Sequence, residues 1–125
     1  MVPRLATVGI GGIAVFAGLV GVEHVLRPDY DPLSRYVSEY AVGPYHQVMT
    51  TAFFALAIGS AATVVRVSRA LSAPARSRGG IVCLGIWSGA ILVAGLFPTD
   101  LSGPNDKPEH PTTPGTIHAL AGITA

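Results

Sequence analysis

Three long apolar stretches dominate the chain, and none of them contains a charged residue. They run over Leu5–Val22, Val48–Val65 and Gly79–Phe97. At about 1.5 Å per residue, helices of this length reach roughly 27 to 29 Å, close to the ~30 Å hydrocarbon thickness of a bilayer. A helix also satisfies its own backbone hydrogen bonds in lipid. The pattern therefore predicts an all-α transmembrane helical bundle with three complete spans.

The first stretch could be a cleaved signal peptide, but its length and the lack of an A-x-A pattern favour an uncleaved span.

Composition supports a nonaqueous environment. Half of the 125 residues are hydrophobic and 12% are charged, about half the charged fraction of an ordinary soluble domain. The lipid bilayer is thus the expected partner. A net charge of +1 gives no indication of nucleic-acid binding. Cys83 is the single cysteine, which excludes an intrachain disulfide and a C-x-x-C motif.

The arginines predict the orientation of the bundle. Five basic residues precede the first span or lie between the second and third: Arg4, Arg66, Arg69, Arg76 and Arg78. By the positive-inside rule these are cytoplasmic, which gives a multipass protein of the cell membrane with a cytoplasmic N-terminus. Residues 23–47 and 98–116 are then outer loops with only Arg27, Arg35 and Lys107, and all acidic and histidine residues fall outside the cytoplasm. Any functional site is therefore expected on the outer face.

The first outer loop carries a helix-like pattern. Asp31 can cap a helix, Pro32 suits its first position, and Gly43-Pro44 can end it. Four apolar residues follow i, i+3, i+4, i+7 spacing: Leu33, Tyr36, Val37 and Tyr40. We expect a short amphipathic helix over Pro32–Val42 that lies at the membrane interface or folds over the bundle as a lid.

The second outer loop, residues 98–115, is rich in proline and polar residues and precedes the start of a fourth helix near Ile117. Thr113 or Thr116 could cap this helix. Its remaining residues would extend roughly 14 Å, too short to cross a bilayer. We expect residues 1–125 to form a single membrane domain that is the N-terminal fragment of a longer protein.

Small residues recur four apart within the spans. Gly85 and Gly89 form a G-x-x-x-G pattern, and Ala14 with Gly18 and Ala55 with Gly59 form looser versions. Such spacing lets helix backbones approach closely. These positions are predicted to pack within the bundle.

Loop residues of the chain resemble a known family. The segment from His24 to Tyr40, the block Phe97-Pro98-Thr99-Asp100 and the block Gly115-Thr116-Ile117-His118 are similar to the bacterial membrane proteins grouped as domain of unknown function 998. The resemblance covers nearly the whole chain. It implies a six-to-seven-span protein of the bacterial cytoplasmic membrane and implies no particular activity.

A polar cluster is predicted on the outer face, with Ser38, Glu39, Asp100 and His118 near one another. Its six candidate members are His24, Ser34, Ser38, Glu39, Asp100 and His118. One interpretation is structural, because orphan backbone groups at helix ends need partners. The other is functional, because ionisable residues at the membrane edge often mark ligand or ion pathways.

Three functional hypotheses remain open. His24, Asp100 and His118 could bind zinc in a metal-dependent membrane hydrolase, with Ser38 or Glu39 assisting a bound water; ceramidase-type and progestin-receptor-type membrane hydrolases are similar in using a Ser, His and Asp set. Alternatively, the chain could be part of a small-molecule transporter in which Glu23 and Asp100 take up protons or bind a cationic substrate, although both lie at span ends. It could also be a noncatalytic protein that binds lipid or a protein partner.

Overall fold

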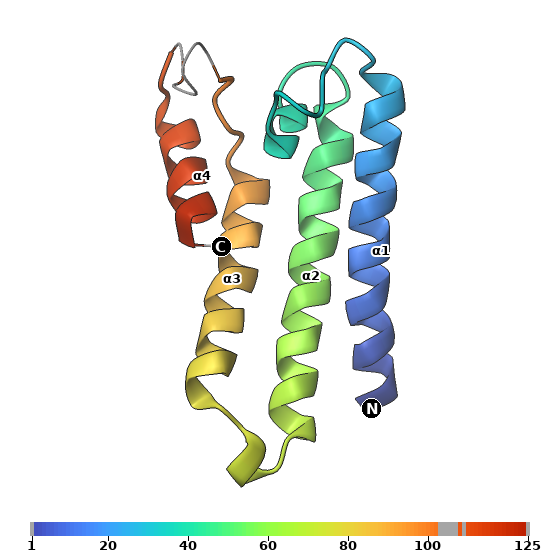
Figure 1. Ribbon diagram of the computed structural model, residues 1–125, viewed down its shortest axis with the longest axis vertical. Coiled ribbons are helices and arrows are strands. Elements are labelled where there is room, and N and C mark those ends of the chain that lie inside the picture. Colours follow the sequence, from blue (N-terminus) through green and yellow to red (C-terminus); the bar gives the residue numbers. More distant parts are fainter. Residues whose placement is uncertain (1, 103–107, 109, 125) are drawn as a thin grey trace.

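The chain forms a transmembrane helical bundle, seen here in a computed structural model that describes residues 2–102, 108 and 110–124. The long helices are α1 (Val2–Leu26), α2 (His46–Ala70) and α3 (Arg78–Leu96), and a shorter α4 spans Thr113–Thr124. They stand side by side in the order α1, α2, α3, α4 (Figure 1). Within the described residues no β-strand forms, and Ser102 and Pro108 make an isolated bridge.

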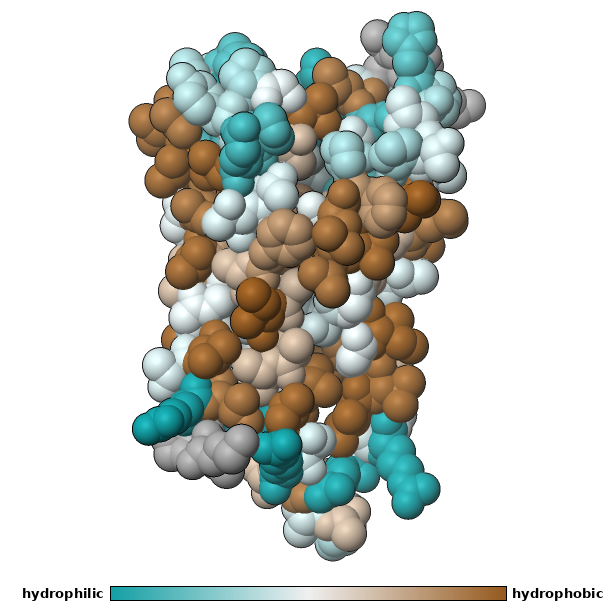
Figure 2. Space-filling view, turned by 180° about the vertical axis from the view of Figure 1, so that it is seen from behind, coloured by the Kyte–Doolittle hydropathy of each residue, from teal (hydrophilic) through white to brown (hydrophobic). Residues whose placement is uncertain are grey.

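The three predicted spans are confirmed as helices, and each is long and apolar enough to cross a membrane. Large apolar side chains point away from the bundle along their length, including Ile10 at 70% exposure and Ile58 at 61%. Figure 2 shows a hydrophobic surface band between hydrophilic groups at the two ends of the bundle. Such a band is what contact with lipid tails requires.

The two ends of the bundle differ in their connections. We call the end formed by residues 27–45, 97–102 and 110–112 the loop end, and the end that carries Arg4 and residues 66–78 the arginine end. At the loop end, a 3₁₀-helix η1 (Val37–Ala41) lies in the α1–α2 connection; at the arginine end, a 3₁₀-turn η2 (Ala73–Ala75) joins α2 to α3 (Figure 1). Three charged residues of the second outer loop, Asp106, Lys107 and Glu109, lie outside the described residues.

Glycines set the close crossing of α1 and α2. A Cβ added to Gly12 would lie 2.4 Å from the carbonyl oxygen of Ala55 and 2.7 Å from the Cα of Gly59. Ala55 and Gly59 are therefore packing positions, as predicted, and their partners on α1 are Gly9 and Gly12. By contrast, an added Cβ at Gly18, Gly85 or Gly89 would meet nothing within 4 Å. The G-x-x-x-G of α3 faces away from the other helices.

The tightest hydrophobic core lies toward the loop end. Tyr40 of η1 packs there with Met49 and Phe53 of α2 and Ala94 of α3. Tyr40 is 1% exposed and Met49 is fully buried. The α1–α2 connection is thus folded onto the bundle.

The amphipathic helix predicted over Pro32–Val42 does not form at that length. Residues 31–35 make turns instead, and the helical segment is η1 alone. The predicted apolar stripe is divided: Leu33 is 96% exposed, while Tyr40 is buried. Pro44 follows Gly43, whose φ of +87° suits glycine and turns the chain toward α2.

Two helix ends also differ from the prediction. α1 continues past Val22 to Leu26, so Glu23 belongs to this helix and not to the following loop; its side chain is fully buried. α4 begins at Thr113, and its first turn is capped by Thr112, whose Oγ1 accepts from the backbone N–H of Gly115 at 3.0 Å. The sequence interpretation had assigned this cap to Thr113 or Thr116.

Candidate functional site

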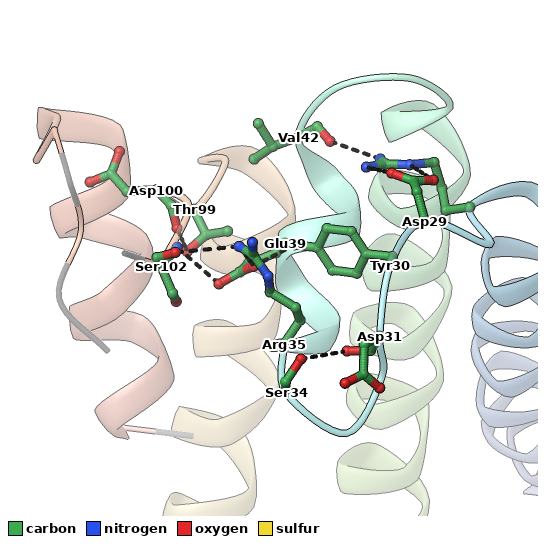
Figure 3. A network of polar contacts seen from close by, with 11 residues as sticks. Asp29, Tyr30, Asp31, Ser34, Arg35, Glu39, Val42, Thr99, Asp100 and Ser102 are labelled. Atoms are coloured by element: carbon green, nitrogen blue, oxygen red, sulfur yellow. Dashed lines mark hydrogen bonds and ion pairs between the residues drawn. The ribbon is translucent and has the colours of Figure 1, made fainter. Parts of the chain in front are cut away.

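Glu39 joins the two connections at the loop end. Its carboxylate is 1% exposed and accepts the backbone N–H of Ser102 at 3.0 Å through Oε1 (Figure 3). Oε2 accepts from the hydroxyl of Tyr30 and from Nη1 of Arg35, the latter at 3.3 Å. Because Tyr30 and Arg35 precede η1 while Ser102 follows α3, one buried carboxylate holds the α1–α2 and α3–α4 connections together.

Arg35 reinforces this junction, which we call the Glu39 network (Tyr30, Arg35, Glu39 and Ser102). Besides Glu39, its Nη1 donates to the carbonyl oxygen of Ser102 at 3.3 Å. Its guanidinium carbon lies 5.5 Å from the ring centroid of Tyr30, within range of a cation–π contact. The Arg35 side chain remains 41% exposed, so its charge is partly screened by solvent.

Burial and hydrogen bonding act in opposite directions on Glu39. Burial disfavours the carboxylate, but the hydrogen bonds from Ser102, Tyr30 and Arg35 outweigh burial and hold the pKa of Glu39 below its usual value. The pKa of Tyr30 is raised, first by burial and then by its hydrogen bond to Glu39. At neutral pH the network therefore contains a charged carboxylate and a neutral phenol that donates to it.

Asp100 organises the start of α4. Its Oδ1 accepts from the hydroxyl of Thr112 at 2.6 Å and its Oδ2 accepts from the backbone N–H of Thr112 at 2.9 Å. These bonds lower the pKa of Asp100. Gly115 packs so closely that an added Cβ would lie 2.1 Å from the Asp100 carboxyl group. The carboxylate is thus held next to the N-terminal turn of α4, whose dipole favours negative charge.

His118 ties α4 to the end of α3. Its ring is 7% exposed, and Nδ1 lies 2.8 Å from the carbonyl oxygen of Phe97 and 3.1 Å from that of Ala94. Both partners are acceptors, so Nδ1 carries the proton and donates it. These carbonyls belong to the last turn of α3, where the helix itself supplies no donor. The ring also meets Phe53 edge-on at 6.0 Å between centroids.

The other two candidates lie apart from these groups. Nδ1 of His24 lies 2.7 Å from the carbonyl oxygen of Val20 one turn back, and its ring contacts Tyr40. Ser34 is exposed and its hydroxyl reaches the carbonyl oxygen of Asp31 at 3.5 Å. Neither side chain joins Glu39, Asp100 or His118 in a common set of contacts.

The structure does not assemble the predicted zinc ligands. In the part of the chain that it describes, no three His, Cys, Asp or Glu side chains are grouped so that they could hold a metal ion. His24 lies against Tyr40 on the α1 side of η1, while Asp100 and His118 contact α3 and α4. The positions of these residues along the sequence could not predict how far apart in space the folded chain places them.

A cavity of about 560 Å³ opens beside the Glu39 network. One wall is polar and comes from η1 and the α3–α4 connection, and the other is the inner face of α4. The polar wall includes Ser38, Asp100 and Ser102, and the α4 face includes Thr116, His118, Ala119, Gly122 and Ile123. Three residues of the predicted polar cluster, Ser38, Asp100 and His118, thus line one cavity.

Sequence reasoning missed three members of the Glu39 network. Arg35 stands four residues before Glu39, a spacing that is visible in the sequence, but the expected helix was interpreted only through its apolar stripe. No sequence pattern indicated the contacts of Tyr30 or of the Ser102 backbone N–H with Glu39. The Ser102 contact joins residues that are 63 positions apart.

The comparison with protein families supports the similarity seen in these loops. A family model described as "Protein of unknown function (DUF998)" matches residues 10–125. The chain belongs to this family. The DUF998 match contains α2, α3, α4 and most of α1, together with every polar residue of the cavity and the Glu39 network. Neither the curated proteins nor the solved structures contain a match to the chain.

Proposed function

We propose that this DUF998 protein is an integral protein of the bacterial cytoplasmic membrane that binds an amphiphile in the cavity at its loop end. The bound molecule would place a hydrogen-bond-donating head, ammonium or hydroxyl, against the polar wall and an apolar chain along α4. The proposed orientation puts the loop end outside and the N-terminus in the cytoplasm. The distribution of arginines supports this orientation.

The cavity is the observation that supports binding. At about 560 Å³ it falls within the usual range for small-molecule sites, roughly 300 to 1,000 Å³. It lies where α3 ends and α4 begins, the level at which an apolar span gives way to polar loops. A lipid-like molecule changes from chain to head at the same level.

The polar wall favours a ligand that donates hydrogen bonds. Asp100 is a carboxylate with a lowered pKa, so it only accepts hydrogen bonds near neutral pH. Nδ1 of His118 donates to the α3 carbonyls, so in the neutral ring Nε2 is an acceptor. Asp100 on the polar wall and His118 on the α4 face thus both present acceptors to the cavity, which suits an ammonium or hydroxylated head better than a phosphate group.

This proposal combines the two interpretations of the polar cluster. Glu39, Asp100 and His118 satisfy helix ends and loop backbone, as the structural interpretation expects. The same contacts fix the walls of the cavity, which is the functional part. The proposal does not use the metal-dependent hydrolase, because His24 contacts Tyr40 and lies apart from Asp100 and His118. The single-domain assignment and a six-to-seven-span full-length protein stay predictions.

Lipid retention tests the proposal. The protein is purified in mild detergent, and the lipids that remain bound are identified by mass spectrometry. Gly122→Leu should fill the cavity, because an added Cβ there meets nothing within 4 Å. Gly89→Leu is the matched control: this glycine is equally open but lines none of the cavities described. We expect roughly tenfold less retained amphiphile for Gly122→Leu alone, as a loss of about 1.4 kcal/mol in binding would give. Equal retention in both variants and the wild type would refute the proposal.

A further inference from the structure

The loop end also buries two polar groups that the cavity and the Glu39 network do not use. Glu23, in the last turns of α1, is 0% exposed, and Tyr40 of η1 is 1% exposed. Within the described part of the chain, neither carboxyl oxygen of Glu23 nor the hydroxyl of Tyr40 has a hydrogen-bond partner. Such groups are rare in folded proteins and call for an explanation.

Glu23 and Tyr40 share one environment. The carboxyl group of Glu23 acts electrostatically on Tyr40. His24, the next residue after Glu23, has its ring centroid 5.3 Å from that of Tyr40. The ring centroid of Tyr30 lies 4.7 Å from that of Tyr40. The start of α2 closes the site, since Met49 is fully buried and its backbone N–H is directed at the Glu23 carboxyl group.

The basic residue nearest to Glu23 in the sequence, Arg27, donates its hydrogen bonds to other groups. Arg27 stands one turn after Glu23, but its Nε and Nη2 donate to the two carboxylate oxygens of Asp29, each at 3.2 Å. Its Nη1 reaches the carbonyl oxygens of Val42 and Pro44. Glu39, the acid of η1, is paired within its own network. Arg27 therefore acts on Glu23 only at a distance, and Glu23 has no ion-pair partner among the described residues.

We infer that Glu23 is a proton-binding site, occupied near neutral pH, with the Tyr40 hydroxyl as its hydrogen-bond partner. A buried carboxylate without donors is strongly disfavoured, and binding a cation removes the charge. A proton is the smallest such cation. It also converts one carboxyl oxygen into a donor, which the Tyr40 oxygen can accept. An ionisable group inside a transmembrane bundle is a frequent mark of proton or ion pathways.

Glu23 belongs to α1, whereas the amphiphile cavity is lined by Tyr36 and Ser38, the α3–α4 connection and α4. Glu23 and Tyr40 line none of the cavities described, so the inference is independent of the proposed function. Proton release would leave a charged carboxylate in the core beside Tyr40. Proton occupancy is therefore coupled to the packing of η1 against α1 and α2.

Infrared spectroscopy of the protein in liposomes tests this inference. A protonated carboxyl group has a C=O stretching band separate from that of a carboxylate, and the band shifts in heavy water. We expect wild-type protein to show one such buried band near neutral pH, and Glu23→Gln to lose it. Tyr40→Phe keeps the ring but removes the hydroxyl, so its band should persist at a higher frequency.

Three results would overturn the inference. These are a wild-type spectrum without the band, a band that persists in Glu23→Gln, and a band unmoved by Tyr40→Phe. Asp31→Asn, which removes an exposed acid from the same connection, is the control and should leave the band unchanged. Helix content from circular dichroism separates loss of the proton site from loss of the fold, and the Tyr40→Phe shift gives a second readout if Glu23→Gln misfolds.

Discussion

Replacing Glu39 with glutamine should loosen the junction between the two connections. The change keeps the side-chain volume but removes the charge that accepts hydrogen bonds from Ser102, Tyr30 and Arg35. Hydrogen bonds to a charged group contribute about 1.5 to 3 kcal/mol each, against about 1 for neutral pairs. We count little for Arg35, since it is 41% exposed. The two remaining bonds predict a loss of roughly 1 to 4 kcal/mol, a substantial part of a typical unfolding free energy of about 5 to 15 kcal/mol.

Unfolding in mixed micelles with increasing denaturing detergent measures this loss, with Trp87 fluorescence as the probe. Asp31→Asn serves as the control, because Asp31 is exposed and bonds only within its own turn. Tyr30→Phe and the double variant complete a cycle that isolates the Tyr30–Glu39 coupling. A Glu39→Gln loss below about 0.5 kcal/mol, the range of surface substitutions, would refute the assignment of Glu39 as the central acceptor.

The same carboxylate predicts a pH dependence. The pKa of Glu39 is lower in the folded protein than its ordinary value, so the folded state binds the proton less readily than the unfolded state. Its contribution to stability is complete above the unfolded-state pKa, about 4.3, and is lost as the pH falls through the folded pKa. Wild-type stability should fall more steeply than that of Glu39→Gln in this acidic range. Parallel curves would contradict the prediction.

Three further changes test the rest of the structure. Gly12→Ala should lose about 1 to 3 kcal/mol of unfolding free energy from overpacking against α2, whereas Gly85→Ala should be neutral or gain up to about 1 kcal/mol; equal effects would contradict the crossing. Asp100→Asn should speed hydrogen exchange of the first α4 amides by weakening the Thr112 cap. Unchanged exchange would show that Asp100 does not support this cap. His118→Phe leaves the two α3 carbonyls without their side-chain donor and should lower the unfolding free energy by about 1 to 3 kcal/mol in the same assay. Wild-type stability would show that these hydrogen bonds do not hold α4 to α3.

The spans could be predicted because lipid imposes a simple requirement on sequence. A charge-free stretch of sufficient length must be helical in a bilayer, and all three such stretches are helices. The close approach of α1 and α2 could be predicted from the sequence for only one of the two helices. Ala55 and Gly59 were identified, but Ala14 and Gly18 were proposed on α1 where Gly9 and Gly12 make the contact. Small-residue spacing indicates that a face can pack without indicating which helix it meets.

Polar residues at the loop end were harder to place, because their environment depends on distant segments. Glu23 ended an apolar run and was therefore assigned to a loop, but α1 continues and buries it. Glu39 was predicted as a member of a polar cluster on the outer face, but its burial and its three partners were not. Buried acids of this kind are recognised only when the groups that surround them are known.

The Glu39–Ser102 hydrogen bond has a consequence for biogenesis. As the chain emerges from the ribosome, α1, η1 and α2 can insert well before Ser102 is synthesised, because 63 residues separate the two partners. Until α3 has crossed the membrane, the first hairpin carries a carboxylate that lacks its backbone donor. The final closure of this end of the molecule must therefore wait for the second hairpin, and a failure of α3 to insert would leave an incomplete junction open to quality-control proteases.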